Sequence, residues 1–175
     1  NAGAGGLMLA LAADVVLARA DTVYNPHYKS MGLYGSEYWT YSLPRTVGQA
    51  MAKQLTEACL PISALQALQM GMVQEIGPRC PDEFGLWLLQ RANGVLNDPR
   101  YQHLRQRKLD ADPQLMQHCR NAELEEMHMD MVQNRKGFAE KCSNFVYKRK
   151  TCCTPERLIE AWALPQPATL IVRSA

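Results

Sequence analysis

The feature that most constrains the fold is a glycine-rich opening, AGAGGLMLALAAD, which spans Ala2 to Asp14. Gly3, Gly5 and Gly6 precede a run of alanine and leucine, a composition that favours a helix. The first N–H groups of a helix lack internal partners and carry the positive end of its dipole. Because glycine lets a ligand approach the backbone closely, the opening predicts either an anion or carbonyl site at a helix start or tight packing against a sheet.

The segments after the opening predict short strands and then a helix. Residues 15–20 (VVLARA) form a β-branched apolar run that is typical of a buried strand, and residues 22–26 (TVYNP) form an extended segment that ends at proline. No strand is expected before the glycines, and their spacing lacks the G-x-G-x-x-G dinucleotide fingerprint. A helix is expected from about Ser36 to Leu43, with Ser36 as its N-cap and Glu37 in its first turn.

The loop between the second strand and this helix is rich in chemistry. Residues 24–41 read YNPHYKSMGLYGSEYWTY, and their ionisable side chains of different kinds are His27, Tyr28, Lys29 and Glu37. Beside the glycine-rich opening, this loop predicts a reaction site with donors for a developing oxyanion and an acid or base next to them. Two plainer interpretations stay open: a Glu37 that serves only the helix dipole, and a His27 that only hydrogen-bonds to backbone.

The order of motifs resembles the second half of a crotonase (enoyl-CoA hydratase/isomerase) domain. The glycine-rich opening is followed by SLPRTVGQAMAKQL at residues 42–55 and LPISALQALQMGMVQEIGP at residues 60–78, in the order of the family pattern. The resemblance implies that Gly5, with Gly6 beside it, binds a thioester oxygen and supplies half of an oxyanion hole. The other half would come from a loop on an earlier strand.

Two positions depart from the hydratase pattern. Enoyl-CoA hydratases use a glutamate shortly after the glycines, where this chain has Met8, and a glutamate after the proline of the second strand, where it has His27. Without these two carboxylates, addition of water across a double bond lacks its acid/base pair. The sequence therefore argues against ordinary hydratase activity.

The same region resembles a narrower subgroup. NPHYKSMGLYGSEYWTYSLPRTVG at residues 25–48 and NFVYKRKTCCTPERL at residues 144–158 are similar to the C-terminal domain of the HypX/HoxX hydrogenase maturation proteins. The resemblance implies a cytoplasmic enzyme that binds coenzyme A and releases carbon monoxide from formyl-CoA. The formyl unit would come from formyl-tetrahydrofolate, used by a missing N-terminal domain, and nickel–iron hydrogenase maturation proteins would be partners.

This chemistry assigns roles to the loop residues. Decarbonylation of formyl-CoA removes the formyl hydrogen as a proton and delivers a proton to the leaving sulfur. Glu37 is the first candidate for proton handling, Tyr28 is its donor or positioning partner, and His27 is a second catalytic candidate. The pocket wall would be formed by Tyr34, Tyr38 and Trp39. A conventional acyl-CoA hydratase or isomerase, and a non-catalytic scaffold that binds coenzyme A, remain the alternatives.

Composition limits the other function classes. At 175 residues and 47% hydrophobic content the chain can bury a core, and a net charge of +2 is too small to indicate nucleic acid. No apolar run approaches the ~18 residues of a membrane span, so no membrane is expected. The cysteines include no C-x-x-C pair, and the histidines of the C-terminal half have no i, i+4 spacing. We expect reduced thiols and assign no metal.

The domain layout follows from the change in composition after Pro78. We expect an α/β fold in which residues 1–78 form part of a crotonase-like ββα spiral, residues 79–164 a helical C-terminal extension, and residues 165–175 a disordered tail. Asp98-Pro99 and Asp112-Pro113 mark breaks or helix starts. A long helix is expected from Pro113 to about Gly137, with one apolar face buried as core. A whole crotonase domain is longer, so the chain is expected to be a fragment.

Overall fold

Short strands and helices alternate through the first half of the chain. The structure is a computed structural model that describes residues 1–149 and 170–171. The first half contains β1 (Ala2–Gly3), α1 (Gly5–Ala12), β2 (Leu17–Arg19), β3 (Val23–Asn25), η1 (Lys29–Met31), α2 (Trp39–Val47), α3 (Gln49–Ala58), β4 (Ile62–Ser63), α4 (Ala64–Gln69) and β5 (Glu75–Gly77). The predicted strands at residues 15–20 and 22–26 are confirmed as β2 and β3, and the two-residue β1 is an addition.

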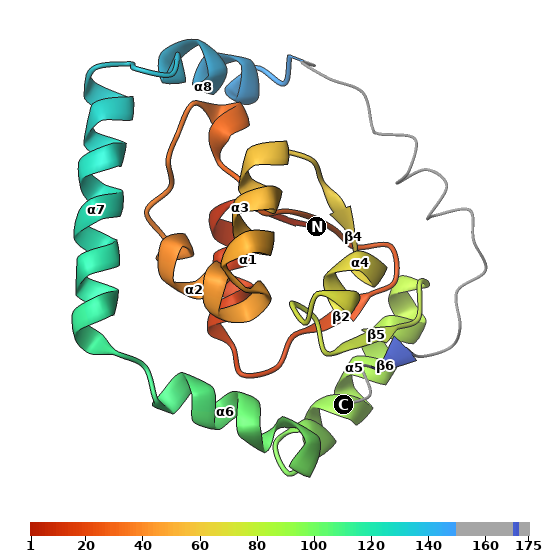
Figure 1. The fold of residues 1–175 in the computed structure, drawn as a ribbon. Helices are drawn as coiled ribbons and strands as arrows, with labels where there is room; N and C mark the ends of the chain where they lie inside the picture. The colour runs from red at the N-terminus through yellow and green to blue at the C-terminus, as the bar shows by residue number, and fades with distance from the viewer. Residues whose placement is uncertain (150–169, 172–175) are drawn as a thin grey trace.

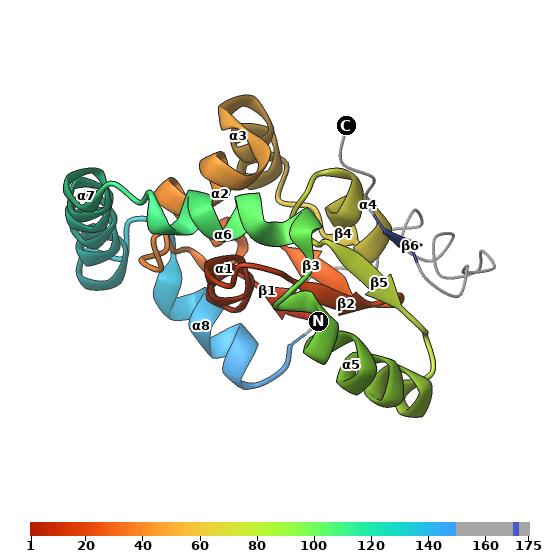
Figure 2. The same cartoon turned by 90° about the horizontal axis from the view of Figure 1, so that it is seen from below.

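The second half is helical and forms a frame around the first. It consists of α5 (Pro81–Val95), η2 (Pro99–Tyr101), α6 (Gln102–Leu109), α7 (Pro113–Val132) and α8 (Phe138–Val146), followed by the short strand β6 (Leu170–Ile171). In Figure 1 these helices run along the lower right, bottom, left and top of the molecule, with α1 to α4 and the strands β2 and β4 inside. Figure 2, seen from below, places α7 at one edge and α5 at the other.

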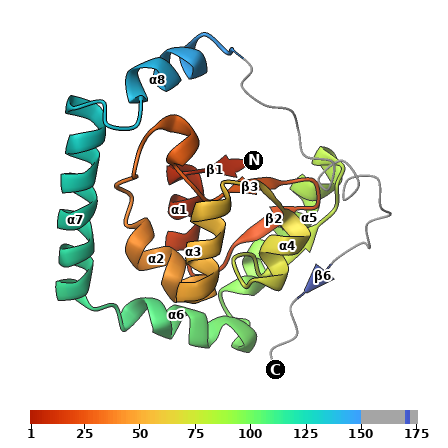
Figure 3. The ribbon, with the colours of Figure 1, turned by 45° about the horizontal axis from the view of Figure 1, so that its top comes forward.

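The strands form two small sheets. In one, β3 pairs in parallel with β1 and antiparallel with β4, and in the other, β5 pairs in parallel with β2 and antiparallel with β6. Figure 3 shows β1 and β3 beside α1, so that the glycine-rich start of α1 emerges at the end of this pair. This mixed arrangement confirms the predicted α/β class. Apart from β6, the proposed tail at residues 165–175 lies outside the described residues.

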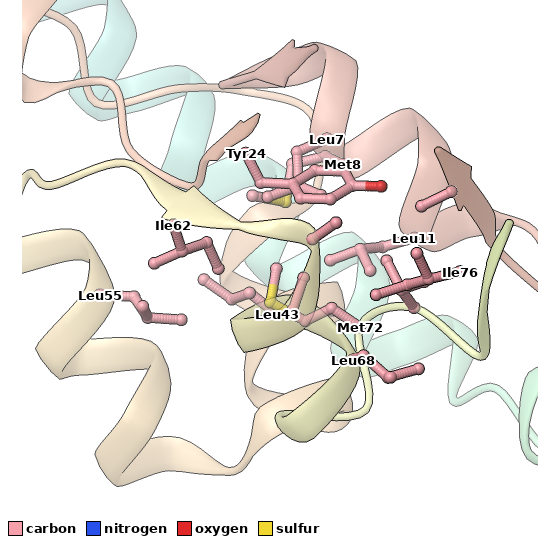
Figure 4. Packing of buried hydrophobic residues seen from close by; sticks show 14 of the residues in the cluster. Leu7, Met8, Leu11, Tyr24, Leu43, Leu55, Ile62, Leu68, Met72 and Ile76 are labelled. Atoms are coloured by element: carbon pink, nitrogen blue, oxygen red, sulfur yellow. The ribbon is translucent and has the colours of Figure 1, made fainter. Parts of the chain in front are cut away.

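The core lies between α1, the two sheets and the helices α2 to α4. Leu7, Met8 and Leu11 of α1 are at most 3% exposed and belong to one cluster with Leu43 of α2 and Met72. Figure 4 shows these side chains together with Tyr24, Ile62 and Ile76 from the strands. Met8, which takes the place of a hydratase glutamate, is therefore a core side chain in this fold.

Helix α2 begins later than expected. Its first residue is Trp39 and its N-cap is Tyr38, so Ser36 is not the cap and Glu37 lies before the helix rather than in its first turn. Tyr38 adopts a left-handed backbone conformation with φ 57° and ψ 29°, which ends the loop sharply. The prediction that Ser36 is the N-cap was wrong, because the first amides of α2 donate to a side chain of another helix, Glu123 of α7.

Helix α7 buries polar side chains instead of a methionine stripe. Its buried residues are Cys119, Glu123 and Asp130, whereas Leu115, Leu124 and Met131 are 44%, 44% and 53% exposed. The helix ends at Val132, before the expected Gly137. Its start is as predicted, because the Asp112 side chain accepts hydrogen bonds from the amides of Gln114 and Leu115. The prediction of one buried face is confirmed only in part, since Met116 and Met127 on it are half-buried and Cys119 is buried, whereas its deepest residues are Glu123 and Asp130.

A buried ion network ties the frame to the sheet at β5. Glu75 is fully buried and accepts two hydrogen bonds from Arg91 Nε, at 2.9 and 2.7 Å, and one from Arg91 Nη2 at 2.6 Å. The Tyr101 hydroxyl also donates to this carboxylate, and Asp98 bridges Arg91 and Arg100. Trp87 packs directly on Gly77 of the same strand. Helix α5 and η2 are thereby fixed to the core.

Candidate active site

Glu37 and Gly5 meet at the start of α1. A Cβ placed on Gly5 would lie 3.0 Å from both Cδ and Oε1 of Glu37. The other oxygen, Oε2, accepts a hydrogen bond of 2.9 Å from the amide of Ser36. The structure therefore brings together the two residues that the sequence placed in separate motifs.

The start of α1 offers backbone donors beside this carboxylate. Gly5 and Gly6 are the first two residues of the helix, where amides have no intrahelical acceptor. A Cβ on Gly6 would meet no atom within 4 Å, so the space in front of it is open. These amides can stabilise an oxygen that gains negative charge close to Glu37.

A cavity of about 310 Å³ opens on the Glu37 side of the loop. Glu37, Tyr38 and Met8 line it on one side, where the start of α2 faces α1. Arg107 and Lys108 of α6 also line it. The Lys108 ammonium donates to the carbonyl of Leu11, and burial lowers its pKa from the ordinary value. The cavity lining thus carries two carboxylates, those of Asp14 and Glu37, as well as the cations, and Asp14 acts on Lys108.

Tyr28 lies next to Glu37 but outside the cavity lining. Its side chain is 5% exposed and packs on Gly35, whose positive φ of 95° and missing Cβ make room for the ring. Burial, and then the neighbouring Glu37 carboxylate, raise the pKa of Tyr28 above its ordinary value. Within the described residues, the buried hydroxyl of Tyr28 has no partner at hydrogen-bond geometry. Tyr28 is therefore a protonated phenol at neutral pH, available to donate toward Glu37 or a ligand.

His27 faces a different part of the molecule. It is 3% exposed, and it lies near the backbone of Cys59 at the end of α3. Burial, together with the positive charge of Lys29, lowers the pKa of His27, so the imidazole is neutral at pH 7. It does not belong to the cavity lining. Its catalytic role stays a prediction, and the structure does not bring it to Glu37.

The three predicted wall residues divide into two groups. Tyr38 lines the cavity, whereas Tyr34 and Trp39 pack behind the loop with ring centroids 5.2 Å apart. Trp39 also approaches Tyr28, with centroids at 6.5 Å. These rings support the loop that carries Glu37 instead of lining the cavity with Tyr38.

One residue that sequence reasoning missed contacts the site from the frame. Glu123 of α7 is fully buried and accepts hydrogen bonds from the amides of Tyr38 and Thr40, both at 2.8 Å. The run Glu123–Glu126 contains three glutamates in a helix that is mostly exposed. No local signal separates the buried one from the others.

The described residues show no further kind of site. Within them, no group of three His, Cys, Asp or Glu side chains is arranged to hold a metal ion. The cysteines at positions 59, 80, 119 and 142 are free thiols, and Cys152 and Cys153 lie outside the described part of the chain. No helix in that part is long and apolar enough to cross a membrane.

The fold is that of a crotonase-type domain, and sequence comparison agrees. The profile of the family described as enoyl-CoA hydratase/isomerase matches residues 1–154. This chain therefore belongs to the enoyl-CoA hydratase/isomerase family.

Two relatives narrow the comparison to hydrogenase maturation. The hydrogenase maturation factor HoxX of Bradyrhizobium diazoefficiens is 52% identical over 77 residues, which make up 43% of this chain and 14% of that protein. The crystal structure of HypX from Aquifex aeolicus in complex with tetrahydrofolic acid matches with a TM-score of 0.73 and 35% identity. That match covers 95% of this chain and 31% of the HypX chain, so the chain spans less than a third of either relative.

More distant structures share the fold alone. An enoyl-CoA hydratase from Mycobacterium avium subsp. paratuberculosis matches with a TM-score of 0.69 at 23% identity, over 88% of this chain and 62% of that one. The predicted crotonase-like architecture is confirmed by these matches, whereas residue roles need other support.

Proposed function

We propose that this chain is the crotonase-like domain of a cytoplasmic hydrogenase maturation factor, which binds coenzyme A and releases carbon monoxide from formyl-CoA. The formyl group would come from formyl-tetrahydrofolate through another part of the protein. The observation that carries the proposal is the contact between the Glu37 carboxylate and Gly5 at the helix start. It supplies a base beside oxyanion donors, although Met8 and His27 replace the two hydratase glutamates.

In the proposed step, the formyl oxygen lies at the amides of Gly5 and Gly6, and Glu37 accepts the formyl proton. The C–H electron pair stays on carbon as the lone pair of carbon monoxide. The C–S bond breaks with its electron pair on sulfur, and the thiolate takes up a proton to give free coenzyme A. Tyr28, protonated and adjacent to Glu37, is suited to supply that proton or to orient the carboxylate.

The whole protein supplied with formyl-tetrahydrofolate and coenzyme A tests the reaction, with carbon monoxide detected by the spectrum of reduced haemoglobin. We expect release by the wild type and a loss of about 100-fold or more in Glu37→Gln, since general base catalysis contributes about that much. Glu57→Gln is the matched control, because Glu57 is an exposed glutamate of α3 that pairs with Lys53 at 3.9 Å. Unchanged release in Glu37→Gln would contradict the assignment.

The alternatives predict other results. A conventional hydratase would add water to crotonyl-CoA, which the apolar Met8 disfavours because a thioether cannot transfer a proton. A scaffold would retain coenzyme A, detected by mass spectrometry of the purified protein, without either activity. Only the proposed function predicts carbon monoxide release without hydration of crotonyl-CoA.

A further inference from the structure

Glu123 holds the segment that follows Glu37. Its side chain is fully buried and reaches from α7 to the start of α2. Besides the amides of Tyr38 and Thr40, the hydroxyl of Thr40 donates to it at 2.6 Å. A buried carboxylate with three donors is well paired, and charge-assisted bonds of this kind are about twice as strong as neutral ones. The contact is therefore specific rather than incidental.

The start of α2 depends on this carboxylate. The N-cap, Tyr38, makes no side-chain capping bond, and its positive φ of 57° costs about 1–2 kcal/mol in a residue that has a Cβ. Glu123 replaces the missing cap and places a negative charge at the positive end of the helix dipole. Since Tyr38 directly follows Glu37, the backbone that aims the Glu37 side chain is fixed from α7.

The other side of Glu37 is held by the same helix. Met127, one turn beyond Glu123, accepts a hydrogen bond of 3.2 Å from the amide of Gly35 through its sulfur. Residues spaced i, i+4 lie on one face of a helix. The side chains of Met127 and Glu123 thus hold the backbone before and after Glu37. The carboxylate of Glu37 itself packs beside Gly5.

We propose that Glu123 is a positioning residue for Glu37, which sets the place of the proton acceptor relative to the amides at the start of α1. The catalytic consequence of this inference rests on the proposed function. The anchoring of the loop by Glu123 rests on its hydrogen bonds to Tyr38 and Thr40. It gives α7, otherwise an exposed helix of the frame, a role in the reaction.

Glu123→Gln in the whole protein tests the inference, because an amide cannot accept from both Tyr38 and Thr40 with its two ends. We expect kcat for carbon monoxide release to fall about 10- to 100-fold, as a misplacement of ~1 Å does, with KM for formyl-tetrahydrofolate and coenzyme A changed less than about threefold. Glu125→Gln removes the same charge from an exposed position on α7 and should behave as wild type. A matching fall in Glu125→Gln, or an unchanged kcat in Glu123→Gln, would overturn the inference.

Amide hydrogen exchange separates this inference from the proposed function. In Glu123→Gln the amides of Tyr38 and Thr40 should exchange at least tenfold faster, while those of α3 keep their wild-type rates. If the wild type releases no carbon monoxide, the proposed function fails, and unchanged exchange at these amides would overturn the anchoring of the loop by Glu123 independently. Should Glu123→Gln not fold, Thr40→Val removes one donor and keeps the backbone amides, so a smaller fall in kcat is expected and its absence counts against the inference.

Discussion

The carboxylate of Glu37 lies so close to Gly5 that a Cβ on Gly5 would be only 3.0 Å from its Cδ and Oε1. Their relation is one of packing between a loop and a helix start. This packing puts a carboxylate beside the backbone amides at the start of α1, and it depends on the absence of a side chain at Gly5.

Gly5→Ala should displace Glu37 without unfolding the protein. The new Cβ would lie 3.0 Å from the carboxylate, which is the flexible end of its side chain and can move aside. We expect carbon monoxide release to fall at least about tenfold and the free energy of unfolding to change by less than about 1 kcal/mol. The activity assay and urea unfolding of the purified variant measure both.

Gly6→Ala is the matched control for Gly5→Ala, because it adds the same methyl group one residue further along α1. Its Cβ meets nothing within 4 Å, so the crystal structure of this variant should show Glu37 unmoved, and the helix should gain up to about 1 kcal/mol. A Glu37 side chain in the same place in both variants would contradict the packing argument.

Gly77→Ala should destabilise the junction between β5 and α5. The added Cβ would come within 2.4 Å of Cε3 of Trp87, and a bulky ring on a packed strand cannot move cheaply. We expect the free energy of unfolding to fall by about 1–3 kcal/mol, as overpacking does. In α5, the Cβ added by Gly85→Ala meets no atom within 4 Å, and this change should raise the free energy of unfolding by about 1 kcal/mol. Equal midpoints for the two variants in denaturant unfolding would show the expectation to be wrong.

Arg91→Met should cost much more than loss of a surface cation. The substitution removes the bidentate partner of the fully buried Glu75 carboxylate. Loss of one partner of a buried ion pair typically lowers the free energy of unfolding by about 3–5 kcal/mol. Lys53→Met breaks an exposed pair of 3.9 Å and should change stability by less than about 1 kcal/mol. Thermal unfolding of both variants beside the wild type measures the difference, and a small effect of Arg91→Met would mean that the network is not important for folding.

The Glu75 network also predicts a loss of stability in acid. Burial alone would raise the pKa of Glu75, but the bonds from Arg91 and Tyr101 outweigh it and leave the pKa below the ordinary 4.5. A lowered folded-state pKa contributes stability that is fully present above about pH 4.5 and is lost as the pH falls through the folded-state value. The unfolding free energy of the wild type should therefore decline more steeply below pH 4.5 than that of Glu75→Gln. Parallel curves would contradict this.

Local signals predicted elements where the cause lies within a few residues. The strands β2 and β3 follow from short β-branched or proline-ended runs, and the Asp-Pro pair at Asp112 marks the start of α7 because the aspartate caps its own helix. The start of α2 was misplaced because its cap is supplied by Glu123, which is 85 residues from Tyr38 in sequence. A pattern of nearby residues carries no information about such a partner.

The sequence alone determined the class of fold, the glycine-rich helix start and the candidates Glu37 and Tyr28, since composition, motif order and helix chemistry are local properties. Tertiary structure decided which candidates meet: Glu37 reaches Gly5, whereas His27 lies near the backbone of Cys59. It also decided that α7 buries Glu123 and Asp130 in place of its methionines. The physical reason is that burial and hydrogen bonding depend on which distant surfaces pack together, and that pairing is set only when the chain folds.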